Sequence, residues 1–197
     1  MDKKTFRKQC LAKLQKAEKN GRLNRNRKVL KRIDMIIRKY NPKSILFYLP
    51  MSHEVDVRPL FRRLRRDRKI YVPFMEGESF KLVQYRLPLK KKRFGIYEPM
   101  NSHFYLSKID MAIVPVVGVD GRFRRIGFGK GMYDRFFGSL RQKPLTVFVQ
   151  LAKCCTKKRI TDDFDVMADI YITPEDITVR GKKDVDRIDH RRCGSHC

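Results

Sequence analysis

Short apolar runs alternate with longer amphipathic stretches along most of this chain, and this alternation constrains its fold more than any other feature. Runs typical of strands occur at 44–49, 69–73, 80–85, 111–117, 145–150 and 170–172. Stretches with helical spacing occur at 3–19, 23–40, 57–66 and roughly 131–140. Strands that alternate with helices favour a mostly parallel sheet flanked by helices. We therefore predict an α/β fold that begins with a pair of helices.

The length of 197 residues suits one domain. We expect that domain to span residues 1–180, because residues 181–197 are polar and mixed in charge, as in a loose tail. The tail contains four residues that could ligate zinc: His190, Cys193, His196 and Cys197. Structural zinc sites usually use two separated ligand pairs, so a tail without metal is the favoured interpretation.

The net charge and the hydrophobicity of the chain indicate which partners it binds and where in the cell it is located. The 47 Lys and Arg outnumber the 21 Asp and Glu, which gives a net charge of +26 and predicts attraction to anions. No apolar run approaches the roughly 20 residues that span a bilayer, and the charged N-terminus is unlike a signal peptide. We therefore expect no membrane association and a cytoplasmic location.

The five cysteines follow no disulfide framework, so we expect reduced thiols, with Cys154 and Cys155 as small buried residues.

A glycine-rich segment follows the most apolar predicted strand, 111–117. Ligands of open α/β sheets bind at the carboxyl ends of strands, where glycines let backbone N–H groups approach phosphate oxygens. Arg125 and Lys130 add two cations suited to phosphate. The segment is neither a Walker A loop nor a dinucleotide fingerprint. Glycine spacing alone leaves a tight turn before a helix as an equal alternative.

The residue identities in several segments are more specific than the glycine spacing. Residues 125–135 (RIGFGKGMYDR) closely resemble the signature of the 5-formyltetrahydrofolate cyclo-ligase family, also called methenyltetrahydrofolate synthetases. Lys3 and Arg7, residues 49–56, residues 94–99, and the Asp165-x-x-x-Asp169 pair with Thr173 resemble other family motifs in the same order. The resemblance spans about residues 3–175 and omits the tail.

The resemblance implies ATP-dependent conversion of 5-formyltetrahydrofolate to 5,10-methenyltetrahydrofolate, with release of ADP and phosphate. It implies Lys130 and Arg125 as catalytic residues and Asp134 and Asp165 as Mg²⁺ ligands, with Asp169 in reserve. The implied ATP-binding residues are Lys3, Arg7, Arg125, Gly127, Gly129, Lys130, Gly131 and Tyr133. The implied folate-binding residues are Leu49, Glu54, Phe128, Gly129, Lys130, Gly131 and Met132. Met132 departs from the usual Tyr, and Phe128 stands where Tyr or Arg is common, which bears on how the folate ring fits.

Two other functions remain open at this point. Basic runs at 62–69 and 90–93 could grip nucleic acid, although no recognised binding motif accompanies them. A different ATP-dependent ligase or kinase could use the same scaffold. We expect a monomer that does not depend on nucleic acid, and we expect Arg86 and the 90–93 run to favour substrates with a polyglutamate chain.

Overall fold

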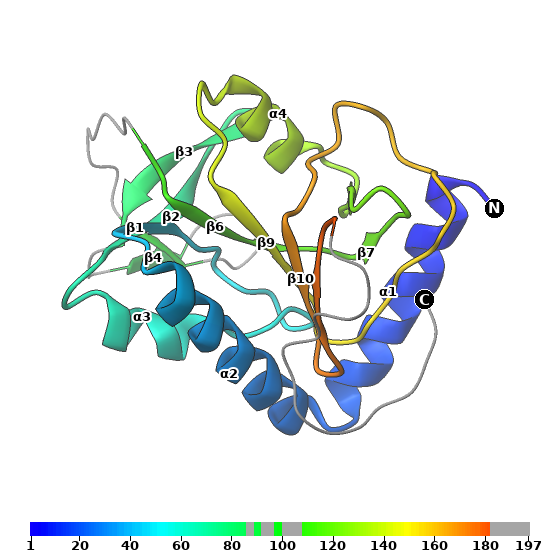
Figure 1. Ribbon diagram of the computed structural model, residues 1–197, viewed down its shortest axis with the longest axis horizontal. Coiled ribbons are helices and arrows are strands. Elements are labelled where there is room, and N and C mark those ends of the chain that lie inside the picture. The colour runs from blue at the N-terminus through cyan, green and yellow to red at the C-terminus, as the bar shows by residue number, and fades with distance from the viewer. Residues whose placement is uncertain (86–88, 92–96, 100–107, 182–197) are drawn as a thin grey trace.

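A seven-stranded sheet forms the centre of the computed structural model, which describes residues 1–85, 89–91, 97–99 and 108–181 (Figure 1). In spatial order its strands are β11 (Ile177–Val179), β10 (Ile170–Ile172), β9 (Leu145–Val149), β6 (Met111–Pro115), β1 (Ser44–Leu46), β2 (Lys69–Glu76) and β3 (Ser79–Gln84). The strands from β10 to β2 run parallel, and only the two edge strands are antiparallel. The predicted mostly parallel sheet is confirmed.

Helices cover both faces of this sheet. The core on one face joins Ile45 and Phe47 to buried residues of α1 (Lys3–Lys19), α2 (Arg22–Tyr40) and α3 (Arg58–Leu64). The core on the other face joins Leu46 to Phe136 and Phe137 of α4 (Met132–Ser139). Neighbouring strand residues thus face opposite sides, as the pleat requires, and both faces are apolar, which is typical of parallel strands. The predicted N-terminal helical pair is confirmed.

The predicted elements have the right type and order, but short pairings were missed. β7 (Gly118–Val119) and β8 (Arg125–Ile126) form an antiparallel ribbon at the glycine-rich segment. β4 (Leu89–Lys91) pairs with β5 (Tyr97–Pro99), and β11 adds an edge to the sheet. Each of these short strands lacks the continuous apolar run that marked residues 170–172. Their formation depends on partners brought together by the rest of the fold.

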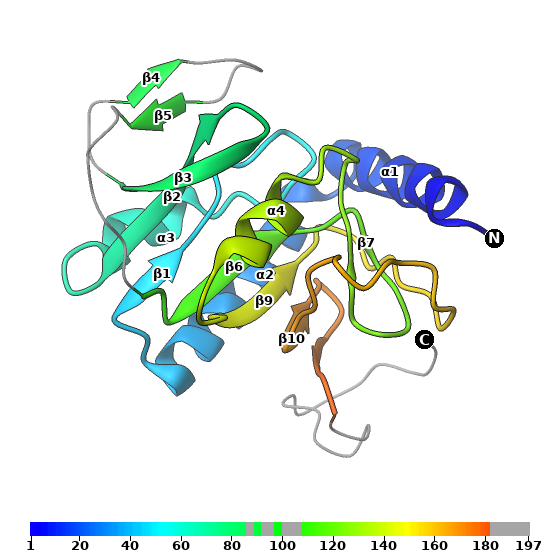
Figure 2. The ribbon, with the colours of Figure 1, turned by 90° about the horizontal axis from the view of Figure 1, so that it is seen from above.

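Helix α1 lies at the end of the sheet, beside β7 and the loop that follows β9 (Figures 1 and 2). Asp2 caps it, because its carboxylate accepts a 2.7 Å hydrogen bond from the Thr5 N–H. A disulfide joins Cys10 in this helix to Cys154 in the loop. The expectation of free thiols is therefore wrong for these two cysteines, and it is wrong for Cys155 as well, which is also disulfide-bonded. Cys10 and Cys154 stand 144 residues apart, so the spacing of cysteines in the sequence could not reveal that they meet.

Several predictions concern residues outside the described ranges. They include the four tail residues with zinc-binding side chains, Arg86, and the motif at 94–99 except for its last three residues. The boundary between domain and tail therefore stays a prediction. Within the described ranges, no helix is long and apolar enough to cross a membrane.

Candidate active site

The glycine-rich loop connects β8 to α4. Gly129 and Gly131 have φ values of 103° and 64°, which side chains rarely adopt, and Gly131 is the residue from which α4 starts. Gly127 is needed for a different reason: a Cβ there would lie 2.2 Å from Nη1 of Arg125. The loop leaves Lys130 exposed, while Phe128 and Met132 are half-buried. The glycines therefore serve both backbone conformation and close packing.

Arg125 lies under this loop, not out in solvent. Its side chain is 6% exposed, and its Nε donates to the carbonyl oxygen of Pro115 at 3.2 Å. The guanidinium carbon stands 4.7 Å from the ring centre of Tyr133, and Nη1 is 3.8 Å from Oδ2 of Asp134. Burial raises the pKa of Tyr133 far above its ordinary value, so this phenol stays neutral. Arg125 is therefore a buried cation that ties the loop to the start of α4.

Helix α1 contributes two further cations, one to the glycine loop and one to the segment around Asp165. Nε of Arg7 donates to the Gly127 carbonyl oxygen at 2.8 Å. Nζ of Lys3 lies 2.5 Å from Oδ2 of Asp165 and 3.1 Å from Oδ2 of Asp162. Burial lowers the pKa of Lys3, but these two carboxylates outweigh it and raise the pKa overall. Lys3 and Arg7 are thus anchored to the two segments that carry the other predicted ATP and metal residues.

The two carboxylates predicted to bind Mg²⁺ approach the same stretch of chain. Oδ1 of Asp134 accepts from the Val166 N–H at 3.1 Å, and Asp165 is the residue before Val166. Oδ2 of Asp165 accepts from Lys3 and from the Asp162 N–H. Mg²⁺ in nucleotide sites typically takes one or two carboxylates, with phosphates and waters completing the shell. Two carboxylates fit that requirement, whereas no cluster of three metal-binding side chains occurs in the described part of the chain.

Asp169, the reserve candidate, has a different environment. Its Oδ2 accepts from the Thr146 N–H at 2.9 Å, and its Oδ1 pairs with Arg180 at 2.8 Å. It stands just before β10, at the amino end of that strand, whereas the glycine loop lies beyond the carboxyl end of β6. These contacts favour Asp165 over Asp169 as the carboxylate next to Asp134.

Glu54 is a further buried carboxylate, and its charge interacts with that of Arg125. It is 8% exposed and accepts a 2.8 Å hydrogen bond from the Met51 N–H. Burial raises its pKa to about 7, although the Met51 N–H and the charge of Arg125 act against the rise. Its charge is felt at Tyr48 and Tyr133, whose pKa values it helps to raise. Leu49, half-buried, packs against the same core face as Phe128.

Three residues of this region were missed by the sequence analysis. Tyr48 is fully buried, and its hydroxyl donates to the Val55 carbonyl oxygen at 2.7 Å, which fixes the loop that carries Glu54. The ring of His53 meets that of Phe128 edge-on at 5.0 Å. Arg135 donates to the Lys130 carbonyl oxygen at 2.6 Å. Arg135 belongs to the 125–135 motif, so the motif itself was the signal that could have identified it.

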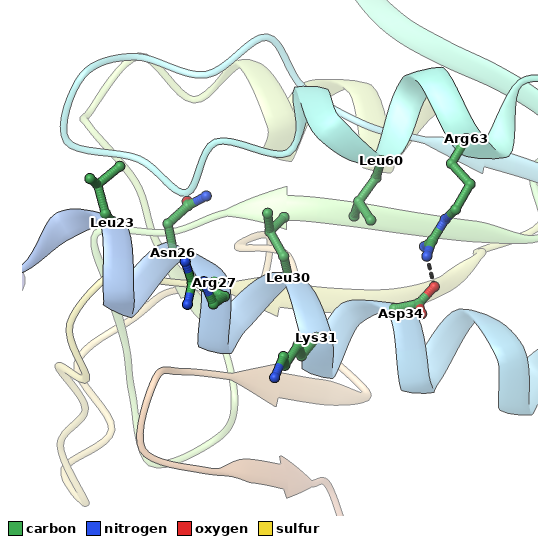
Figure 3. Close-up of a pocket in the computed structure, with 8 residues that line it drawn as sticks. All are labelled: Leu23, Asn26, Arg27, Leu30, Lys31, Asp34, Leu60 and Arg63. Atoms are coloured by element: carbon green, nitrogen blue, oxygen red, sulfur yellow. Dashed lines mark hydrogen bonds and ion pairs between the residues drawn. The ribbon is translucent and has the colours of Figure 1, made fainter.

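A separate groove of about 430 Å³ lies between α2 and α3 (Figure 3). Leu23, Leu30 and Leu60 form its apolar part, and Arg63 pairs with Asp34 across it. None of its lining residues belongs to the glycine loop or to the predicted carboxylates. The groove is therefore distinct from the candidate active site.

The sheet and the loop together place the chain among α/β proteins with a glycine-rich, cationic loop after a central strand. Residues 1–174 match the family model of 5-formyltetrahydrofolate cyclo-ligases, and the chain belongs to that family. The motif resemblance noted in the sequence is confirmed.

Individual relatives agree with this assignment. The chain is 27% identical over 186 residues to a 5-formyltetrahydrofolate cyclo-ligase of Mycoplasma pneumoniae, covering 89% of this chain and 100% of that one. It is 25% identical over 117 residues to the corresponding protein of Haemophilus influenzae, where the match covers 55% of this chain and 63% of the relative. Its fold is similar to the solved structure of Aquifex aeolicus 5,10-methenyltetrahydrofolate synthetase, with a TM-score of 0.75, 27% identity and coverage of 98% and 100%.

Proposed function

We propose that this protein is an ATP-dependent cyclo-ligase that converts 5-formyltetrahydrofolate to 5,10-methenyltetrahydrofolate, with ADP and phosphate as the other products. Family membership supports the reaction. The observation that carries the assignment to this site is the convergence of α1 on the glycine loop, through the 2.8 Å bond from Arg7 to Gly127. That contact brings Arg7 to a loop that lies 120 residues further along the chain and carries Lys130.

The chemistry explains the requirement for ATP. The formyl group is an amide, so its carbon is a poor electrophile and its oxygen a poor leaving group. Attack of that oxygen on the γ-phosphorus of ATP forms a new O–P bond and releases ADP, which gives an iminium phosphate. The neighbouring anilino nitrogen then bonds to the activated carbon and loses its proton, the C–O bond breaks, and phosphate leaves with the pair of electrons from that bond. Phosphoryl transfer of this kind needs mainly positioning and charge stabilisation.

The cations around the loop suit that first step. Lys130 is exposed on the glycine loop, so its side chain can approach the transferred phosphoryl group and stabilise the negative charge that builds up there. Arg125 is buried under the loop, and we assign it the role of holding the loop and Asp134 in place. Lys3 and Arg7 would contact the phosphates from the α1 side. Asp134 and Asp165 would hold Mg²⁺, which supplies charge neutralisation for the phosphates when bound.

Glu54 suits the folate side of the site. An ionised carboxylate can accept two parallel N–H bonds from the amino-pyrimidinone edge of a pterin. Leu49, Phe128 and Met132 would line the same pocket with apolar surface. A pKa of about 7 means that Glu54 is near half-ionised at neutral pH, so a ligand that donates hydrogen bonds would favour the ionised form.

Turnover with defined substrates tests the proposal. The purified protein should form 5,10-methenyltetrahydrofolate only when ATP, Mg²⁺ and 5-formyltetrahydrofolate are all present, with one ADP and one phosphate released per product. ATP hydrolysis that is independent of the folate, or phosphorylation of another acceptor at a higher kcat/KM, would assign the site to a different ligase or kinase.

A further inference from the structure

The disulfide between Cys10 and Cys154 connects the two segments on which the proposed nucleotide site depends. Cys10 is fully buried, and Cys154 is 3% exposed. Lys3, Arg7 and Cys10 follow at intervals of four and three residues, so they share one side of α1. The covalent bond therefore lies about one turn from Arg7 and two turns from Lys3.

The sheet end of the disulfide is held firmly. The Cys154 carbonyl oxygen accepts from the Val119 N–H at 3.1 Å, and the Cys154 N–H donates to Oε1 of Gln150 at 3.1 Å. Val119 belongs to β7, the strand whose ribbon leads into Arg125 and the glycine loop. The tie thus attaches α1 to a part of the molecule that is rigidly connected to the loop.

The helix end has weaker support. Apart from the disulfide, α1 is fixed by the buried side chains of Phe6, Leu14 and Ala17, by the Arg7 bond to Gly127 and by the Lys3 ion pairs. Lys3 and Arg7 are the groups that would turn toward nucleotide phosphates, so their present contacts would be exchanged on binding. At the tie itself α1 packs closely on β7, because a Cβ on Gly118 would lie 2.9 Å from Phe6 and 3.0 Å from the Cys10 sulfur.

We propose that the Cys10–Cys154 disulfide is a redox-sensitive tie that holds α1 ready to bind ATP, so that reduction lowers the affinity for the nucleotide. Because both sulfurs are buried, a dithiol reductant would attack one of them during local opening of α1. It would form a mixed disulfide and then leave two protein thiols and its own cyclic disulfide. Glutathione disulfide would reverse the change and release two glutathione thiols. Without the tie, ordering α1 becomes part of the cost of binding. The inference rests on the proposed ATP site.

The expected effect is selective. Reduction should raise the KM for ATP and the Kd of a non-hydrolysable ATP analogue, each roughly tenfold. The KM for 5-formyltetrahydrofolate should change little, because Glu54 and its loop do not belong to α1. By thermodynamic reciprocity, the analogue must favour the oxidised protein by the same factor. A tenfold preference corresponds to a midpoint potential about 30 mV more negative with the analogue bound.

Because Cys155 is disulfide-bonded as well, the test uses a Cys155→Ala background, in which the redox buffer acts on the Cys10–Cys154 tie. It compares this background in dithiol buffer and in glutathione disulfide with the double variant, which carries Cys10→Ala and Cys154→Ala in the same background. The double variant should match the reduced background in analogue affinity and should no longer respond to the redox buffer. If the double variant is unstable, the oxidised and reduced forms of the background still provide the comparison. An unchanged Kd for the analogue on reduction, a response that persists in the double variant, or an equal loss of folate and nucleotide binding would each overturn the proposal. Redox-dependent analogue binding without cyclo-ligase turnover would instead overturn the proposed function alone.

Discussion

Lys130 is the exposed cation of the glycine loop, and its removal tests the phosphoryl-transfer role most directly. Lys130→Ala should lower kcat/KM for ATP by about 2–4 kcal/mol of transition-state stabilisation, because one charge-assisted contact to the phosphates is lost. The fold should be unaffected, since the side chain is exposed. Lys143→Ala, an exposed lysine after α4, serves as the control and should keep full activity. Unchanged kcat and KM in a folded Lys130→Ala variant would remove this residue from the mechanism.

Glu54 should make the stability of the protein depend on pH. Its pKa is raised from 4.5 to about 7 by folding, so the folded state keeps a proton that the unfolded state loses. The free energy of unfolding should therefore fall as pH rises from about 4.5 to about 7, by about 3 kcal/mol, and change little from this source above pH 7. Glu54→Gln should remove this part of the decline. Urea unfolding at several pH values measures it, with the exposed Glu78→Gln as the control.

The same carboxylate should report folate binding. At pH 7 the empty site is about half protonated, so a pterin that bonds to the ionised form should release part of a proton. Calorimetry of folate binding in buffers with different ionisation heats measures this release. Glu54→Gln should bind folate more weakly, release no proton and keep its affinity for the ATP analogue. An equal loss of both ligands would indicate a folding defect and contradict the assignment.

Substitution can distinguish the two proposed Mg²⁺ ligands, Asp134 and Asp165, from Asp169, which we expect to have a purely structural role. Asp134→Asn and Asp165→Asn should each raise the Mg²⁺ concentration required for half-maximal turnover, because each removes an anionic ligand. Asp169→Asn should instead lower stability with the Mg²⁺ dependence unchanged, since its bonds to Thr146 and Arg180 hold strands together. A Mg²⁺ titration of all three variants distinguishes them. A normal titration curve for either of the first two would show that this residue is not a ligand.

At the scale of elements, the glycine loop and α4 form a unit whose packing can be tested with one methyl group. Gly127→Ala would place a Cβ 2.2 Å from the Arg125 guanidinium, so the guanidinium would have to shift. We expect a loss of about 1–3 kcal/mol in stability, together with reduced turnover.

Gly138, within α4, is the matched control for this substitution. It has an ordinary φ, and no atom lies within 4 Å of an added Cβ. Gly138→Ala should stabilise the protein by roughly 0.5–1 kcal/mol, because alanine loses less entropy than glycine in a helix. Thermal or urea unfolding compares the two variants. Equal effects at the two positions would mean that the contact between Gly127 and Arg125 does not determine the loop.

At the scale of the whole molecule, the charge of +26 should act on the anionic substrate through the field of the surface. Helices α2 and α3 carry several exposed cations. Three of them have no ion-pair partner among the described residues: Arg27, Lys31 and Arg62. Exposed charges contribute about 0.2–1 kcal/mol each, so substrates with longer polyglutamate chains should bind only modestly tighter. The gain should shrink at high salt, because the Debye length falls from about 10 Å at 0.1 M to about 3 Å at 1 M.

The KM values for mono- and polyglutamylated substrate at two salt concentrations, with and without RNA, measure this effect. RNA that inhibits strongly at low salt and with a steep salt dependence would point to a nucleic-acid role for the basic surface. Equal KM values for both substrates at low salt would show that the surface charge does not serve the folate.

The sequence by itself determined the order and type of the main elements and the family. The spacing of apolar residues along the chain shows which side chains become buried, and it can be read without knowing what they pack against. It correctly predicted β1 between α2 and α3, β2 after α3, β6 before α4 and β9 after α4. The motif at 125–135 identified the glycine loop because its glycines and cations are contiguous in the chain. Those features are local, so they can be recognised before the chain is folded.

Only the tertiary structure determined which residues, distant in the sequence, are in contact. The Cys10–Cys154 bond, the Lys3 pairs with Asp162 and Asp165, and the burial of Arg125 beneath Gly127 all join residues that the chain brings together by folding. The raised pKa of Glu54 likewise arises from burial among distant segments, which no local pattern encodes. Short-range periodicity carries no information on such contacts, because their geometry depends on how the sheet orders its strands.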